Sequence, residues 1–164
     1  MFAQLRVLDE APRCTVYSLC RGEDADAVRA SETTIFNAFV DAHKDGPLQD
    51  HLAVLLRIIE RFGQKGAKAH YFRGEDYAVA LPRIKDNPIR VYAIRFGEGA
   101  VVLLFGSIKS SQRAREGDTR NAFDEAQAVG RHLTELLADR ELTIDSLETR
   151  EAHGFEFEYE YIYE

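Results

Sequence analysis

The sequence contains little cysteine, and its two cysteines are poorly placed for a disulfide. Cys14 and Cys20 lie six residues apart in one segment with the pattern of a strand. Six residues of strand separate two Cα atoms by about 20 Å, whereas a disulfide needs roughly 7 Å or less. We therefore expect two reduced thiols with a structural role, as in a cytoplasmic protein.

Long apolar runs and metal-binding motifs are absent as well. No stretch approaches the ~18 apolar residues of a membrane helix, and the start of the chain lacks the pattern of a secretion signal. There is no H-x-x-x-H or C-x-x-C motif. The FGEG segment lies between two predicted strands, not before a helix where glycines hold a phosphate. These absences predict a cytoplasmic location, no membrane contact, no metal and no other cofactor.

Positive charge is scarce overall but concentrated in one segment. The net charge is −7, which argues against a protein that coats nucleic acid. Residues 83–120 nevertheless hold eight Lys or Arg and four Asp or Glu, a local balance of +4. We call this segment the basic island, and it is the part of the chain best suited to bind an anion.

The spacing of apolar residues predicts an α+β fold. Periods near 3.6 residues indicate two helices in the first half, one after Ser31 and one from Leu48 to Phe62, and a third from about Asp118 to Asp139. Alternating or continuous apolar runs indicate strands. These cover Ala3–Leu8, Cys14–Cys20, Tyr77–Leu81, Ile89–Phe96 and Val101–Phe105. The helices should pack on a mostly antiparallel sheet.

The end of the chain has a separate pattern. Residues 1–145 predict a single domain, and residues 146–164 predict an appended acidic and aromatic strand. Phe155, Phe157, Tyr159, Tyr161 and Tyr163 alternate with mostly acidic residues, so the aromatic face should pack somewhere. Three outcomes are open: an edge strand on its own sheet, a strand added across a homodimer, or a brake that places glutamates over the basic island.

The segment ALPRIKDNPIRVYAIRFGEGAVVLLFGSIKSS, residues 80–111, resembles the core of the RelE/HigB family of toxin ribonucleases. In that family a strand that ends in Leu-x-Arg precedes an Arg-(Val/Ile)-Tyr strand, and an apolar strand then runs into a Lys-rich exit. The order of two helices, three strands and a closing helix agrees over about Phe36–Leu137. The resemblance implies a RelE-like fold.

The resemblance also implies metal-independent cleavage of mRNA, in which basic side chains hold the phosphate. By position it assigns catalytic roles to Arg83, Arg90 and Lys109. Arg90 is the strongest candidate, because an arginine within a central strand needs an anion or water. For Arg83 and Lys109, an alternative is an ordinary surface cation at a strand end. The other cations of the island are candidates for RNA binding: Lys85, Arg95, Arg113 and Arg115.

The catalytic acid of the family is not evident. Many members carry a tyrosine, or an Asp-Tyr-His group, a few residues after the position of Lys109, where this chain has SSQRAREGD. Tyr92 and His70 are the nearest replacements. The simpler interpretation is that Tyr92 is a packed strand residue and His70 a surface residue.

Two classes of function therefore remain open. One is a RelE/HigB-type endoribonuclease toxin, with a cognate antitoxin and RNA or the ribosome as partners. The other is a non-catalytic member of the fold that binds a protein or a polyanion. The missing acid–base residues favour the second, and the placement of the three basic residues favours the first.

Overall fold

Six strands form one open sheet in the part of the chain that the structure describes. The structure is a computed structural model, and it describes residues 1–74, 76–109 and 116–161, with the backbone alone for 116–119. The strand order is β3-β4-β5-β2-β1-β6. Neighbouring strands are antiparallel, except that β2 and β5 are parallel. The strands are β1 (Phe2–Ala11), β2 (Cys14–Gly22), β3 (Val79–Leu81), β4 (Ile89–Phe96), β5 (Ala100–Ile108) and β6 (Glu156–Glu158).

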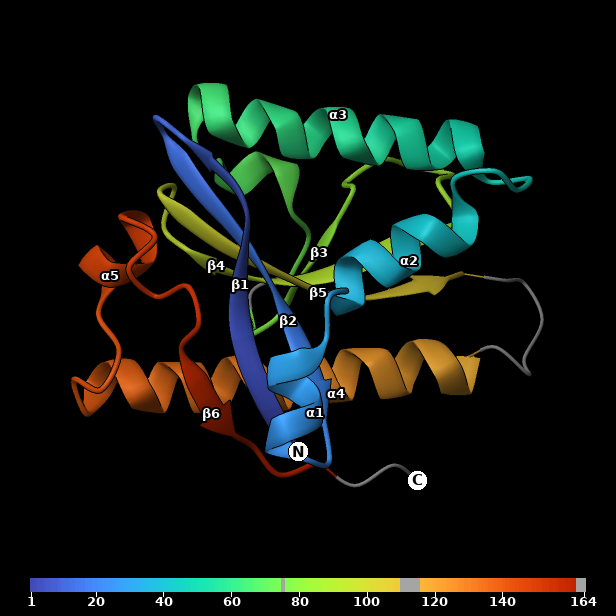
Figure 1. Cartoon of the computed structure of the whole chain (residues 1–164). Coiled ribbons are helices and arrows are strands. Elements are labelled where there is room, and N and C mark those ends of the chain that lie inside the picture. The colour runs from blue at the N-terminus through green and yellow to red at the C-terminus, as the bar shows by residue number, and fades with distance from the viewer. Residues whose placement is uncertain (75, 110–115, 162–164) are drawn as a thin grey trace.

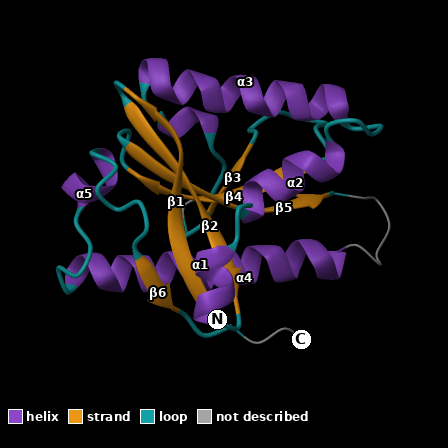
Figure 2. Ribbon diagram, in the orientation of Figure 1, coloured by secondary structure: helices purple, strands orange, loops and turns teal. Residues whose placement is uncertain are grey.

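Helices cover both faces of this sheet (Figure 1, Figure 2). α2 and α3 lie on one face and α4 lies on the other, which makes three layers. The described residues contain five α-helices and one short 3-10 helix. They are α1 (Ala25–Ala30), α2 (Ile35–His43), α3 (Gln49–Lys65), η1 (Ala69–Tyr71), α4 (Glu116–Ala138) and α5 (Ile144–Glu148).

The central strands are apolar on both faces because each face is covered by helices. In β4, Tyr92 and Ile94 point into the core with α4, while Val91 and Ala93 point into the core with α2 and α3. This double burial explains the nearly continuous apolar runs of β4 and β5. It confirms the prediction that 89–96 and 101–105 are central strands.

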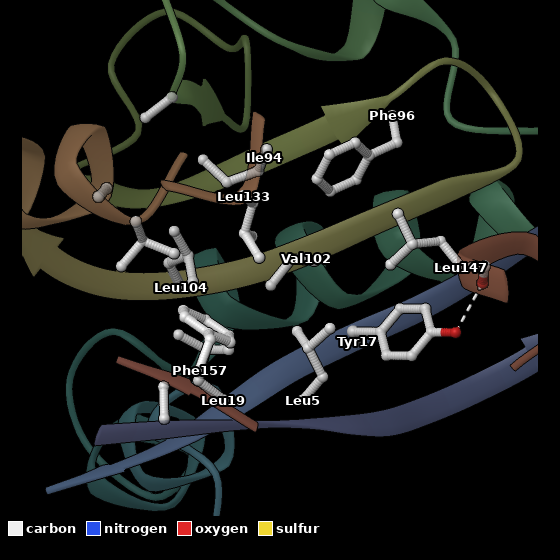
Figure 3. Packing of buried hydrophobic residues seen from close by; sticks show 14 of the residues in the cluster. Leu5, Tyr17, Leu19, Ile94, Phe96, Val102, Leu104, Leu133, Leu147 and Phe157 are labelled. Carbon is white, nitrogen blue, oxygen red and sulfur yellow. Dashed lines mark hydrogen bonds between the residues drawn. The ribbon is translucent and has the colours of Figure 1, made fainter. Parts of the chain in front are cut away.

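The core on the α4 side also joins distant parts of the chain (Figure 3). Leu5 and Leu19 of the first two strands pack in one cluster with Leu133 of α4 and Phe157 of β6. The Tyr17 hydroxyl donates a hydrogen bond of 2.6 Å to the carbonyl of Leu147 in α5. The start and the end of the chain therefore share one core.

The segment before α2 differs from the prediction. No helix was predicted before Ser31, but α1 begins at Ala25, where the Asp24 side chain caps it by accepting a hydrogen bond from the Asp26 amide. Ser31, after which the first helix was predicted to begin, is the C-cap of α1. Thr34 is the N-cap of α2 and accepts from the Asn37 amide.

The last segment forms both a helix and a strand. Thr143 and Ser146 form a capping box that starts α5. β6 then pairs with β1, with Phe157 opposite Ala3. Phe157 and Tyr159 are buried, Phe155 and Tyr161 are partly buried, and Tyr163 lies outside the described residues. The four described aromatic side chains pack against the core of their own chain.

The predicted mixture of helices and a mostly antiparallel sheet is confirmed. The N-terminal helices pack on the sheet, and a further long helix and a C-terminal strand follow. Cys14 and Cys20 are free and buried, as predicted. In the described part of the chain, no helix combines the length and the apolar character needed to cross a membrane.

Candidate functional site

Four cationic side chains line one cavity at the β3–β4 side of the sheet. The cavity has a volume of about 430 Å³, and we call it the basic pocket. Its charged lining residues, among those described, are four cations and one carboxylate: Arg73, Lys85, Arg90, Lys109 and Asp86. Arg90, Lys109 and Lys85 were singled out from the sequence, and the fold brings them together.

The turn between β3 and β4 lines part of the basic pocket. The buried Asn87 side chain accepts a hydrogen bond of 2.9 Å from the Ile89 amide, and Asp86 has a φ of 67°. Asparagine and aspartate favour such tight local turns, since short polar side chains bond to nearby amides. The Lys109 amide donates to the Pro88 carbonyl at 2.6 Å. That bond holds the end of β5 against the turn and places Lys109 at the pocket.

Arg90 lies at the start of β4 and is partly buried. Its Nη1 atom makes long hydrogen bonds to the carbonyls of Asn87 (3.3 Å) and Ile89 (3.4 Å). Burial, and secondarily the nearby charge of Arg73, lower the pKa of Arg90. An arginine remains protonated in spite of such a shift, so Arg90 is a fixed cation.

Among the described residues, the positive charge of the basic pocket exceeds the negative charge that faces it. No ion pair among the described residues involves any of the four cations. Asp86 is the one carboxylate that lines the pocket within those residues. Clustered like charges repel one another, and a concave surface of one sign concentrates counter-ions. An anionic ligand would relieve that repulsion.

Arg73 is a member of the site that sequence reasoning missed. It precedes β3, and its amide and carbonyl form a pair of 2.8 Å hydrogen bonds with Ala80. This isolated bridge aligns Arg73 with the edge of β3 and directs it to the basic pocket. The signal in the sequence was weak, because a one-residue bridge has no periodic pattern.

Arg83 does not line the basic pocket. It is exposed and lines a neighbouring cavity of about 370 Å³ together with residues of α3 and η1. Arg83, which the resemblance grouped with Arg90 and Lys109, therefore lines a different cavity from those two residues. Arg83 lies in the β3–β4 connection before the turn at residues 85 and 86, whereas Lys85 and Asp86 form that turn and line the basic pocket.

Tyr92 does not reach the basic pocket either. Only 7% of the residue is exposed, and its ring packs edge-on against Phe123 of α4 with 5.5 Å between centroids. Burial raises the pKa of Tyr92, and the Ser107 hydroxyl and the Arg90 charge offset part of that increase. The simpler interpretation of a packed strand residue is the one that the structure supports.

The other predicted RNA-binding residues are dispersed. Arg95 lies near the far end of β4, about 16 Å from Arg90 along the strand. Its Nε atom donates to the Ala67 carbonyl at 2.6 Å, so it joins β4 to the segment after α3. Arg113 and Arg115 lie outside the described residues.

Groups suited to acid–base chemistry are few at this site. Asp86 is the one carboxylate among the described side chains that line the basic pocket, and His70 lines the neighbouring cavity. The described residues contain no cluster of three or more His, Cys, Asp or Glu side chains arranged to hold a metal ion. The site as described is suited to holding an anion.

The glutamates of the tail lie at the opposite edge of the sheet. β6 is the last strand on one side, whereas β3 is the last strand on the other. Glu156 forms an ion pair with Arg29 of α1 at 2.7 Å, and this contact lowers the Glu156 pKa. The tail therefore does not place Glu156 or Glu158 over the cations of the basic pocket, as the brake hypothesis required, because β6 and β3 lie at opposite edges of the sheet.

Comparison with known proteins adds no relative to this description. No protein-family model, no curated protein and no solved structure matches the chain.

Proposed function

We propose that this chain binds RNA by holding a backbone phosphate in the basic pocket. The observation that carries the proposal is a group of four cations, none of which forms an ion pair with a described residue, in one cavity of a chain whose net charge is −7. Lys85 and Lys109 are exposed and can reach a ligand, while Arg90 is held by the turn. Arginine and lysine are the usual partners of phosphate in proteins.

The resemblance to RelE/HigB toxins supports RNA as the source of that phosphate. It had assigned phosphate-holding roles to Arg90 and Lys109 from their positions alone. These two residues are 19 positions apart in the sequence, and both line the basic pocket. Membership of that family remains a proposal, as do an antitoxin or the ribosome as partners.

The test is the salt dependence of RNA binding by Arg73→Ala and Lys109→Ala. Loss of one phosphate contact should weaken binding and reduce the slope of log K against log salt by about 0.7. Fluorescence anisotropy with a labelled single-stranded RNA measures both quantities. Arg13→Ala is the matched control, since Arg13 is an exposed cation in the β1–β2 turn, away from the basic pocket. Equal slopes for all three variants and the wild type would contradict the proposal.

Cleavage of the bound RNA is a second candidate function, favoured by the presence of Asp86 beside the cations. The Asp86 carboxylate would take the proton of a 2′-hydroxyl, whose oxygen then attacks the adjacent phosphorus. The bond from phosphorus to the 5′-oxygen breaks, and a lysine ammonium gives that oxygen a proton. The products are a 2′,3′-cyclic phosphate and a 5′-hydroxyl, with no metal required.

Asp86→Asn separates cleavage from binding. If the second candidate holds, this variant loses cleavage by 100-fold or more (on the order of a general base) and binds RNA at least as tightly as the wild type. End-labelled RNA incubated with EDTA, with and without ribosomes, gives the rate and the product ends. Binding without cleavage by the wild-type chain under both conditions would leave the protein as a binding module.

A further inference from the structure

A second cationic cavity lies beside the basic pocket. We call it the α3 pocket; its volume is about 370 Å³. Arg57 and Arg61 of α3 line it, together with Arg83 from the β3–β4 connection and His70 and Tyr71 of η1. No acidic side chain lines it among the described residues, and none of its three arginines forms an ion pair there.

Local structure positions the arginines of the α3 pocket on one surface. Arg57 and Arg61 are four residues apart in α3, so their side chains lie on the same face of the helix, one turn apart. Val54 and Ile58 lie on the adjoining stripe and give the cavity an apolar base. Both arginines are exposed, so their guanidinium groups are accessible to a ligand.

Two aromatic rings complete this cavity. Tyr71 is partly buried and packs against Phe62, with 5.5 Å between ring centroids. The exposed His70 ring lies 4.3 Å from the Tyr71 ring. The Tyr71 ring, which packs on Phe62, and the neighbouring His70 ring therefore present flat surfaces beside the guanidinium groups of this cavity. Single-stranded nucleic acid is bound by this combination, because bases stack on rings while cations hold the phosphates.

The two cavities are neighbours because they are built from the same two chain segments. Arg83 and Ile84 line the α3 pocket, and Lys85 lines the basic pocket. Likewise Tyr71 lines the α3 pocket, and Arg73, two residues later, lines the basic pocket. Consecutive Cα atoms are about 3.8 Å apart, so a strand that leaves one cavity along these segments reaches the lining of the other within one or two residues of the protein chain.

We propose that the α3 pocket holds the next nucleotides of the RNA strand whose phosphate occupies the basic pocket. Arg57 and Arg61 contact phosphates, and Tyr71 with His70 stacks a base. The inference rests on the proposed function, and it specifies the ligand as a single strand several nucleotides long. Together the two cavities present seven Lys or Arg side chains and one carboxylate among the described residues.

Oligouridylates of two and ten nucleotides, bound to the full chain and followed by fluorescence anisotropy, test this inference. The double variant R57A/R61A should weaken binding of the ten-nucleotide RNA about tenfold or more and change that of the dinucleotide less than twofold. Lys109→Ala should weaken both. Arg13→Ala is again the control, and circular dichroism verifies that each variant is folded.

Inorganic polyphosphate of similar charge distinguishes base stacking from charge alone. Tyr71→Leu, and separately His70→Ala at an exposed position, should weaken binding of the ten-nucleotide RNA. Binding of polyphosphate should stay unchanged, because it has no bases to stack on these rings. Equal weakening of both polymers would overturn the role of the rings. The second variant keeps the test valid if Tyr71→Leu unfolds the protein.

The outcomes separate this inference from the proposed function. If Lys109→Ala weakens both RNAs while R57A/R61A affects neither, the inference is overturned and the proposed function stands. If R57A/R61A weakens binding of the longer RNA while Lys109→Ala weakens binding of neither RNA, the proposed function is overturned. The inference that one strand occupies both cavities is then overturned as well. If neither variant alters binding, both are overturned.

Discussion

At the scale of single residues, a buried charge joins three parts of the chain. Glu125 of α4 is fully buried and accepts a hydrogen bond of 2.6 Å from the Tyr159 hydroxyl. It also forms an ion pair of 3.3 Å with Arg21 of β2, whose guanidinium lies 4.9 Å from the centre of the Phe105 ring. A buried carboxylate needs such partners, since an unsatisfied charge in the core is strongly unfavourable.

Tyr159→Phe should lower the free energy of unfolding by about 1.5–3 kcal/mol, because it removes a hydrogen bond to a charged group. Urea denaturation followed by circular dichroism measures the change. Tyr77→Phe serves as the control, since Tyr77 is 47% exposed, and its effect should stay within about 0.5 kcal/mol. Equal stabilities of the two variants would show that the Tyr159 hydroxyl contributes nothing.

The raised pKa of Tyr17 leads us to expect that the folded protein loses stability in alkaline solution. Burial raises the pKa of its phenol to about 12 in the folded protein, from 10.0. The unfolded chain therefore releases this proton first as the pH rises. Stability from the neutral phenol is complete below pH 10 and is lost as the pH increases towards 12. Urea unfolding at pH 8 and pH 11 should show a smaller decline for Tyr17→Phe than for the wild type; an identical decline would be contrary evidence.

At the scale of elements, the tail is a structural part of the sheet. β6 covers the outer edge of β1, and the Leu5 amide donates to the Phe155 carbonyl at 2.9 Å. Phe157 and Tyr159 fill the core on the α4 side. An uncovered edge beside exposed aromatic rings is prone to aggregate.

Deletion of residues 155–164 should destabilise the protein by several kcal/mol, about 2 kcal/mol for each buried aromatic side chain, and cause aggregation. RNA affinity of any soluble fraction should stay unchanged, because the tail and the basic pocket lie at opposite edges of the sheet. Light scattering and anisotropy measure the two effects. Glu156→Ala, which retains the strand, is the control. A soluble truncated chain that binds RNA more tightly than the wild type would contradict this prediction and would support the hypothesis that the tail inhibits RNA binding.

Elements were predictable from the sequence where apolar spacing was regular. Ala126, Val129 and Leu133 are buried in α4, as their spacing predicted. α1 was missed because its acidic, short segment lacks an apolar stripe and depends on the Asp24 cap. The end of β3 was correct, but Tyr77, predicted in that strand, lies outside it and is exposed.

At the scale of the whole molecule, the site was predictable only in part. The basic island identified Arg90 and Lys109, which lie at the ends of β4 and β5 that antiparallel pairing brings together, and Lys85, which lies in the turn before β4. Arg73 could not be found, because only the fold places it beside them. For Arg83, sequence distance was misleading, since a turn directs neighbouring residues into different cavities.

The strand order has a consequence for synthesis of the protein on the ribosome. The β1–β2 hairpin can form as soon as it emerges, but β2 finds its parallel neighbour only when β5 appears, since Thr15 pairs with Ala100. The other edge of β1 remains unpaired for longer, until β6 emerges. At roughly 5–20 residues per second, translation leaves that edge open for several seconds or more. A nascent-chain chaperone would therefore meet two unpaired strand edges of the hairpin until β5 emerges, and one until β6 emerges.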